Sequence, residues 1–113
     1  EAERLLIKGL DTGERKGDIL VRLGLIQFQS GKVNTSLETL ALAESYAVSR
    51  VNSLIAQGQI LMNNKSYITA ARKLETAIAE GAGDRALNLY QNCMHAARKQ
   101  ELDQISLTTG AVQ

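Results

Sequence analysis

Cys93 and His95 are the residues of this chain whose types could combine in nucleophilic or metal chemistry. A thiolate and an imidazole can act as nucleophile and base, and both can bind zinc. Two positions apart on a helix, however, their side chains point in different directions. Because the chain contains one Cys and one His in all, it cannot build a zinc site from four nitrogen and sulfur ligands. The pair is predicted to be structural, and no metal or other cofactor is expected.

Acidic pairs and a glycine-rich segment are the other candidates for chemistry. Glu1 with Glu3, and Glu38 with Glu44, could serve as acid and base, but the neighbouring polar residues are typical of a solvated helix face. The sequence GAGD at 81–84 lacks the spacing of a phosphate-binding loop and indicates a helix end followed by an N-cap aspartate. No set of nucleophile, base and oxyanion donors converges, so the chain is predicted not to be an enzyme.

Composition and charge narrow the classes of partner. The 113 residues are 44% apolar, enough for one modest core in a single small domain or a short repeat array. Thirteen basic and twelve acidic residues nearly balance, which argues against a nucleic-acid partner. No apolar run approaches the roughly 18 residues of a membrane span, and residues 1–10 lack a signal-peptide pattern. We expect a soluble domain without membrane insertion, and the single cysteine leaves both the cytoplasm and a bacterial periplasm open.

Helix-forming residues dominate the chain. It contains no proline and 4% aromatic residues, while Ala, Leu, Glu, Gln and Lys are abundant. Helix breaks are predicted within 9–18, at Ser30–Gly31, at Asn63–Asn64 and at 81–84. Short helices joined by short turns pack as antiparallel neighbours. The predicted fold class is therefore all-α.

Residues 17–50 and 51–84 match each other at an offset of 34. The equivalent pairs include Leu20 and Leu54, Gly24 and Gly58, Ile26 and Ile60, Leu40 and Leu74, and Ala43 and Ala77. Small residues at helix crossings let paired helices approach closely, while the leucines fill the space between them. The offset therefore predicts two copies of one helical hairpin.

This period, with small residues in both helices of the unit, resembles the tetratricopeptide repeat, a helix-turn-helix unit of 34 residues. The first-helix signature is carried by Leu20, Leu23, Gly24 and Gln27, and again by Leu54, Gln57, Gly58 and Leu61. The second-helix signature is carried by Ser36, Leu40 and Ala43, and again by Ala70, Leu74 and Ala77. The usual Trp and Tyr of the first helix are absent, and Val48 and Ala82 stand where a proline is expected.

The resemblance implies antiparallel helix-turn-helix repeats stacked as a short right-handed α-solenoid. The implied single domain, residues 1–103, comprises the second helix of a partial repeat (1–10), two repeats (17–50 and 51–84) and a capping helix (85–103). Residues 104–113 are predicted to form a flexible tail.

A second apolar side is predicted on the first helix of each repeat. Val21, Leu25 and Phe28 share one side at helical spacing, and the resemblance implies that this side lines a concave groove for a peptide. The equivalent positions are Ile55, Gln59 and Met62 in the next repeat, and Leu89, Cys93 and Ala96 in the last helix. The predicted partner-binding residues are Val21, Leu25, Phe28, Ile55, Gln59, Met62, Leu89 and Tyr90.

The predicted function is a non-enzymatic protein–protein interaction module with an apolar groove. By analogy, it would serve as a scaffold or chaperone in assembly of a larger machine, such as a bacterial secretion or pilus system. The subclass that clamps carboxylate tails of chaperones is not expected, because Val21, Leu25 and Ala56 stand where the clamp needs polar side chains. Two alternatives stay open: the chain's own ends cover the apolar side, or the chain is a self-associating structural module of a larger solenoid or homo-oligomer.

Overall fold

The structure, a computed structural model, describes residues 16–105 with their side chains and the backbone of the last helix as far as Gly110. It contains α2 (Lys16–Gln29), α3 (Val33–Glu44), α4 (Arg50–Asn63), α5 (Tyr67–Ala79) and α6 (Asp84–Gly110). No strand occurs in this described part of the chain, and the all-α class is confirmed. The helix predicted at 1–10 lies outside the described residues.

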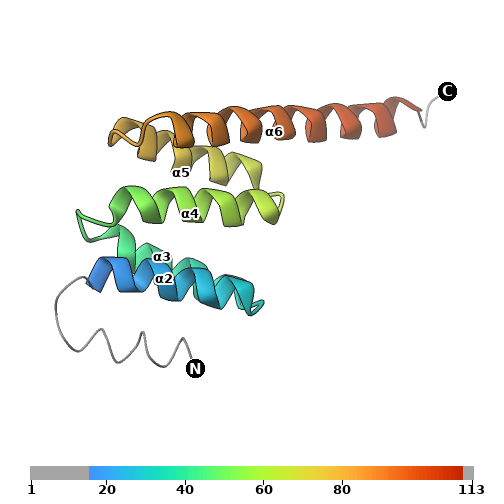
Figure 1. The fold of residues 1–113 in the computed structure, drawn as a ribbon. Helices are drawn as coiled ribbons and strands as arrows, with labels where there is room; N and C mark the ends of the chain where they lie inside the picture. Colours follow the sequence, from blue (N-terminus) through green and yellow to red (C-terminus); the bar gives the residue numbers. More distant parts are fainter. Residues whose placement is uncertain (1–15, 111–113) are drawn as a thin grey trace.

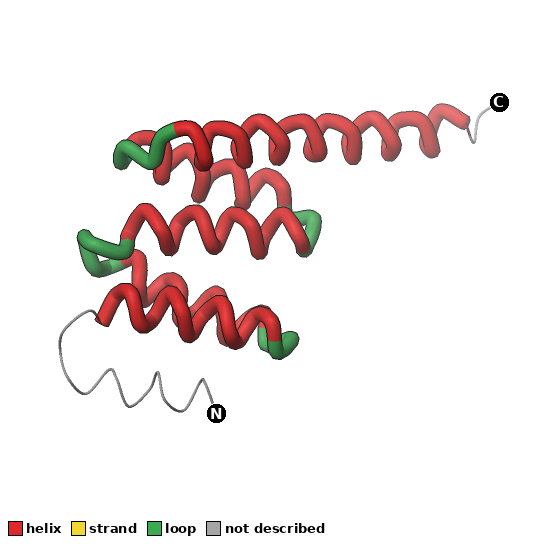
Figure 2. The backbone as a smooth tube through the Cα atoms, in the orientation of Figure 1, coloured by secondary structure: helices red, strands yellow, loops and turns green. Residues whose placement is uncertain are grey.

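The helices form two antiparallel hairpins, α2 with α3 and α4 with α5, followed by the long helix α6 (Figure 1 and Figure 2). Each helix packs on the next one in the chain, and α4 also contacts α2 on one side and α6 on the other. The 34-residue offset is visible in the elements themselves. Shifting the bounds of α2 by 34 gives those of α4, and the starts of α3 and α5 are related in the same way.

The same tight turn ends α2, α4 and α5. Gly31, Lys65 and Gly81 adopt left-handed φ values of 85°, 63° and 93°. In the first turn the Lys32 N–H donates to the Gln27 carbonyl at 2.9 Å, and the equivalent bond closes each of the other two turns. This geometry satisfies carbonyls at a helix end and reverses the chain within a few residues. The helix breaks predicted at these three places are confirmed.

The turn Ser45–Ser49 joins the two hairpins, and it has a different construction. The Ser49 hydroxyl is buried and donates to the Ala43 carbonyl at 2.7 Å, which holds the turn against the end of α3. A Cβ atom placed on Gly17 of α2 would collide with the Ser49 side chain. No helix break is predicted here, because the segment contains neither Gly nor Pro to indicate one.

Close approach within each hairpin depends on Gly24 and Gly58. A Cβ atom built on Gly24 would lie 2.7 Å from Leu40 Cγ, and one on Gly58 would lie 2.8 Å from Leu74 Cγ. Both leucines are fully buried, so they cannot move aside. In α6 the equivalent position is occupied by Asn92, whose side chain is exposed. A further helix could not pack on that side of α6 as closely as α3 packs on α2.

Polar side chains link the hairpins. The Glu44 carboxylate of α3 accepts a hydrogen bond from Gln57 Nε2 at 2.9 Å and pairs with Lys73 Nζ at 3.3 Å. The Ser53 hydroxyl of α4 donates to the Leu40 carbonyl. Among the described residues no buried side-chain nitrogen or oxygen lacks a partner. The buried polar atoms are therefore satisfied, and their hydrogen bonds help to specify how the two hairpins pack.

The helix α6 is longer than predicted at both ends. It begins at Asp84, which was expected to be the cap before the helix, and it continues to Gly110 rather than ending at 103. Only its first half packs on α5, where Cys93 is fully buried and its thiol contacts the Tyr67 carbonyl at 3.0 Å. All residues from Arg98 to Ile105 are exposed, and Figure 1 shows this half projecting past the other helices.

No helix in the described chain is both long enough and apolar enough to span a membrane.

Candidate functional site

A shallow groove crosses the three helices α2, α4 and α6. Its volume is about 240 Å³. The lining residues are Val21 and Leu25 from α2, Asn52, Ile55, Ala56 and Gln59 from α4, and Arg85 from α6. Contributions from all three helices mean that the relative positions of the two hairpins and α6 define its shape.

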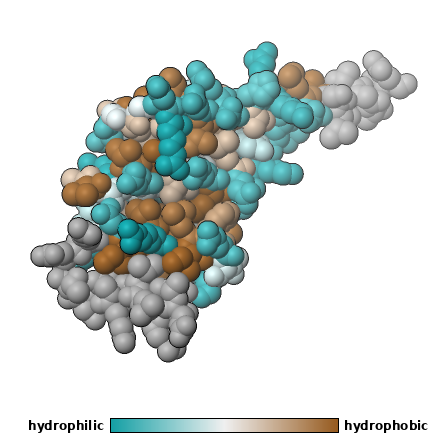
Figure 3. Space-filling view, viewed as in Figure 1, coloured by the Kyte–Doolittle hydropathy of each residue, from teal (hydrophilic) through white to brown (hydrophobic). Residues whose placement is uncertain are grey.

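The floor of the groove is apolar, and its rim is polar. Ile55 and Ala56 are 4% and 5% exposed and form part of the core, whereas Val21 and Leu25 are half-buried. Asn52, Gln59 and Arg85 are exposed at the edge. Figure 3 shows hydrophobic and hydrophilic areas side by side on this view of the molecule. Such a surface can take an apolar side chain and bond the polar groups beside it.

The rim side chains keep their hydrogen-bonding capacity. Asn52 and Gln59 make no hydrogen bond to the other described residues, and Arg85 forms none of the ion pairs within 16–105. An amide offers two donors and one acceptor oxygen, which match the carbonyl and N–H of a peptide backbone. The guanidinium supplies a fixed positive charge.

Four of the eight predicted partner-binding residues meet in this groove: Val21, Leu25, Ile55 and Gln59. The other four lie elsewhere. Phe28 is half-buried against the cluster of Leu40, Ala56 and Ile60, where α2 meets α3 and α4. Val21 and Leu25 pack against the same cluster, but they also line the groove, whereas Phe28 does not.

Met62, Leu89 and Tyr90 pack against a cluster between α4, α5 and α6. This cluster contains Cys93, which is buried. The repeat offset predicted Cys93 at a groove position, but it does not line the groove. The reason is that α6 packs chiefly on α5, so its predicted groove positions turn toward that helix.

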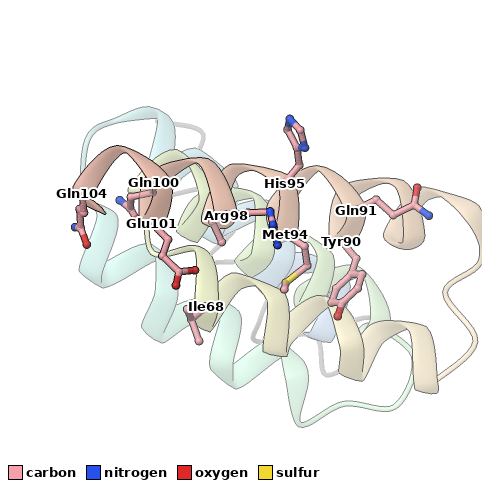
Figure 4. Close-up of a pocket in the computed structure, with 10 residues that line it drawn as sticks. Ile68, Tyr90, Gln91, Met94, His95, Arg98, Gln100, Glu101 and Gln104 are labelled. Carbon is pink, nitrogen blue, oxygen red and sulfur yellow. The ribbon is translucent and has the colours of Figure 1, made fainter. Parts of the chain in front are cut away.

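Tyr90 faces a different depression, of about 770 Å³, along the exposed side of α6 (Figure 4). Its hydroxyl donates to Glu75 Oε1 at 3.1 Å. This hydrogen bond, followed by the negative charge of Glu75, raises the pKa of the Tyr90 phenol. Tyr90 is consequently tied to α5 and is not a groove residue.

Two groove residues were not predicted, Asn52 and Arg85, and Ala56 was named only as a position unsuited to a carboxylate clamp. Asn52 precedes Ile55 by three positions and Gln59 by seven, a spacing that places it on the same helix side. Arg85 precedes Leu89 by four positions. Helical spacing thus places both residues beside predicted groove positions, although neither continues an apolar side at the repeat period.

The candidates for catalysis and metal binding remain apart in the structure. Cys93 is buried and burial raises the pKa of its thiol, whereas His95 is exposed on another side of α6. Glu44 is engaged with Gln57 and Lys73. Within the described residues no three His, Cys, Asp or Glu side chains gather as a metal site. Glu1 and Glu3 lie outside those residues.

The structure thus defines an all-α protein with two helical hairpins, a long final helix and a small groove across their junction. Comparison of the chain with protein-family models, curated proteins and solved structures gave no match. The groove itself is therefore the basis for a functional proposal.

Proposed function

We propose that this chain is a tetratricopeptide-type solenoid that binds a peptide segment of another protein in the groove across α2, α4 and α6. The observation that carries the proposal is an apolar floor surrounded by polar side chains that have no partner among the described residues. The repeat assignment is supported by the 34-residue offset of the helices and by the matched Gly24–Leu40 and Gly58–Leu74 contacts.

The size of the groove suggests how a peptide would bind. At about 240 Å³ it is smaller than a typical small-molecule site and suits one or two side chains of an extended segment. An aliphatic side chain would rest on Ile55 and Ala56, with backbone groups bonded to Asn52 and Gln59. Arg85 favours an acidic residue beside the aliphatic one. The contact area is modest, so we expect a dissociation constant of roughly 1–100 μM.

The proposed partner is a protein, and the proposed role is not enzymatic. Arg85 is the only cationic side chain that lines the groove within the described residues, whereas a polynucleotide would need several. A role as scaffold or chaperone in the assembly of a larger machine is the use that we propose by analogy with other helical-repeat proteins.

Selection from a random peptide display library tests the proposal. Peptides recovered with the native chain would be measured by fluorescence anisotropy against the Asn52→Ala/Gln59→Ala variant. Both side chains are exposed, so the variant should stay folded, which circular dichroism would verify. We expect affinity to fall about tenfold or more because the bonds to the peptide backbone are lost.

The Asn88→Ala/Asn92→Ala variant is the matched control, because it removes two exposed amides from α6 outside the groove. Its affinity should equal that of the native chain. Equal weakening by both variants, or failure to recover any peptide, would count against the groove as a binding site.

A further inference from the structure

The projecting half of α6 carries apolar side chains with no partner in the structure. Leu102 and Ile105 are 52% and 53% exposed, although a helix segment normally derives most of its stability from packing an apolar side. The first residue of α5, Tyr67, contacts Cys93 of α6. The projecting half of α6 follows Cys93 and therefore extends past α5. Packing against a partner would bury both side chains.

Exposed positions along α6 follow a heptad spacing. Successive steps of four, three, four, three and four residues link Leu87, Gln91, Met94, Arg98, Glu101 and Ile105. We call these six residues the α6 seam. All six are exposed, and their spacing is the one at which two helices can pack along each other. Leu87, Met94 and Ile105 are apolar, whereas Gln91, Arg98 and Glu101 are polar or charged.

The seam is complementary to itself in the antiparallel direction. If two seams cross with the twofold axis between residues 99 and 100, Arg98 faces Glu101 of the second copy, and Glu101 faces its Arg98. Met94 faces Ile105 of the second copy in the same register. Both charges of the seam thus meet an opposite charge, and Met94 and Ile105 meet each other, twice over by symmetry. We propose that the α6 seam pairs with the α6 seam of a second copy of this chain.

The depression beside the seam fits the same arrangement. It is lined by Ile68 of α5 together with Tyr90, Met94, Arg98 and Glu101 of α6 (Figure 4). Ile68 is 59% exposed. In the antiparallel register Ile105 of the second copy lies opposite Met94, at this depression, so each projecting half of α6 covers Met94 and Ile68 of the other copy.

Charge symmetry favours a second copy over an unrelated occupant. Arg98 and Glu101 take part in none of the ion pairs among the described residues. An unrelated partner would need no symmetric placement of opposite charges about one point on the helix. This pairing leaves the groove lined by Val21 and Gln59 free, so it is independent of the proposed peptide binding.

Sedimentation equilibrium of the full chain over a wide concentration range tests the pairing. We expect a monomer–dimer equilibrium. Arg98→Glu should raise the dimer dissociation constant about tenfold or more, and so should Glu101→Arg, because each places like charges opposite each other. The Arg98→Glu/Glu101→Arg double variant should restore the native value, since the swapped charges are again complementary.

Mixing the two single variants gives a sharper result. The Arg98→Glu chain carries two negative charges at the seam centre, and the Glu101→Arg chain carries two positive ones. We expect each variant alone to be mainly monomeric and an equimolar mixture to form heterodimers. Lys99→Glu and Asp103→Arg are matched controls, because they make the same charge changes at exposed positions of α6 outside the seam. These controls should dimerise as the native chain does.

A chain that stays monomeric throughout the concentration range would overturn the proposal. The proposal would also be overturned if Arg98→Glu and Glu101→Arg left the dimer dissociation constant unchanged. The same holds if the Lys99→Glu and Asp103→Arg controls raised that constant equally. Circular dichroism and thermal unfolding of every variant at a dilution where the native chain is monomeric would show that lost dimerisation is not lost folding.

Discussion

Leu74 of α5 lies directly against Gly58 of α4, so closely that a Cβ atom at Gly58 would fall 2.8 Å from Leu74 Cγ. Gly24 and Leu40 repeat this relationship one hairpin earlier, at 2.7 Å. In each hairpin the glycine of the first helix leaves room for the leucine of the second helix, and this contact sets the distance between the two helices.

Gly58→Val should destabilise the protein by about 1–3 kcal/mol, because the fully buried Leu74 has no room to move. Thermal or urea unfolding would measure the loss. Combining it with Leu74→Ala should give a loss smaller than the sum of the two single changes, since the shortened residue makes space. Strict additivity of the two losses would show that the contact does not govern helix spacing.

Lys65→Gly should stabilise the protein by about 0.5–1 kcal/mol. Lys65 has a left-handed φ of 63° in a turn whose counterparts use Gly31 and Gly81, and that conformation is unfavourable for a residue with a Cβ atom. The midpoint of urea unfolding would rise. Lys65→Ala is the control, because it removes the same charge and keeps the Cβ atom, so it should give no such gain.

Glu44→Ala should cost about 1–2 kcal/mol, because it removes the acceptor shared by Gln57 and Lys73 and loosens the junction of the two hairpins. A double-mutant cycle of Glu44→Ala with Lys73→Ala would isolate the ion pair. Both side chains are 33% exposed, so solvent screening should hold that coupling below about 1 kcal/mol. A second cycle would combine Glu44→Ala with Gln57→Ala. Coupling energies of zero in both cycles would show that these contacts do not stabilise the junction.

The free energy of unfolding should fall as pH rises above the ordinary pKa of a cysteine. Burial raises the pKa of Cys93, so the folded state holds the thiol proton at a pH where the unfolded chain has released it. The stabilisation is complete below the unfolded pKa and is lost as pH rises through the folded pKa. Urea unfolding between about pH 7 and pH 10 would measure this slope.

Cys93→Ala is the control for that slope. The variant should be less stable at neutral pH, because the buried sulfur leaves a small cavity, but its stability should depend less on pH. Tyr90, whose pKa is also raised, would contribute a similar decline at higher pH and would remain in the variant. An unchanged pH slope in Cys93→Ala would contradict the assignment to the thiol.

Local sequence signals account for most of the helical framework. The breaks at Gly31, Asn64 and Gly81 carry glycine or asparagine, and those residue types end helices for conformational reasons that do not depend on the rest of the chain. The turn at Ser45–Ser49 has no such signal, and its geometry comes from the Ser49 bond to the Ala43 carbonyl and from contact with Gly17. Sequence analysis could not anticipate it because the contact with Gly17 joins segments far apart in the chain.

Some residues of the candidate site could be predicted from the sequence, and others could not. Helical spacing places Val21 and Leu25 on one side of α2, the 34-residue offset gives Ile55 and Gln59 on α4, and the resemblance to tetratricopeptide repeats implies that this side lines a groove. Leu89 and Cys93 obey the same spacing yet pack between helices, because the orientation of α6 is set by its contact with α5, and Met62 of α4 packs against the same cluster. Spacing specifies which residues share a side of a helix, but it does not specify what that side faces.

The sequence by itself determined the all-α class, the 34-residue offset and the small residues at which paired helices meet, because helix periodicity and side-chain size are local properties. Only the tertiary structure decided how α6 is rotated against α5, which polar residues form the rim of the groove, and that the α6 seam is left exposed. These features depend on contacts between distant segments, where the burial of side chains such as Cys93 and Leu74 selects one arrangement among several that the pattern allows.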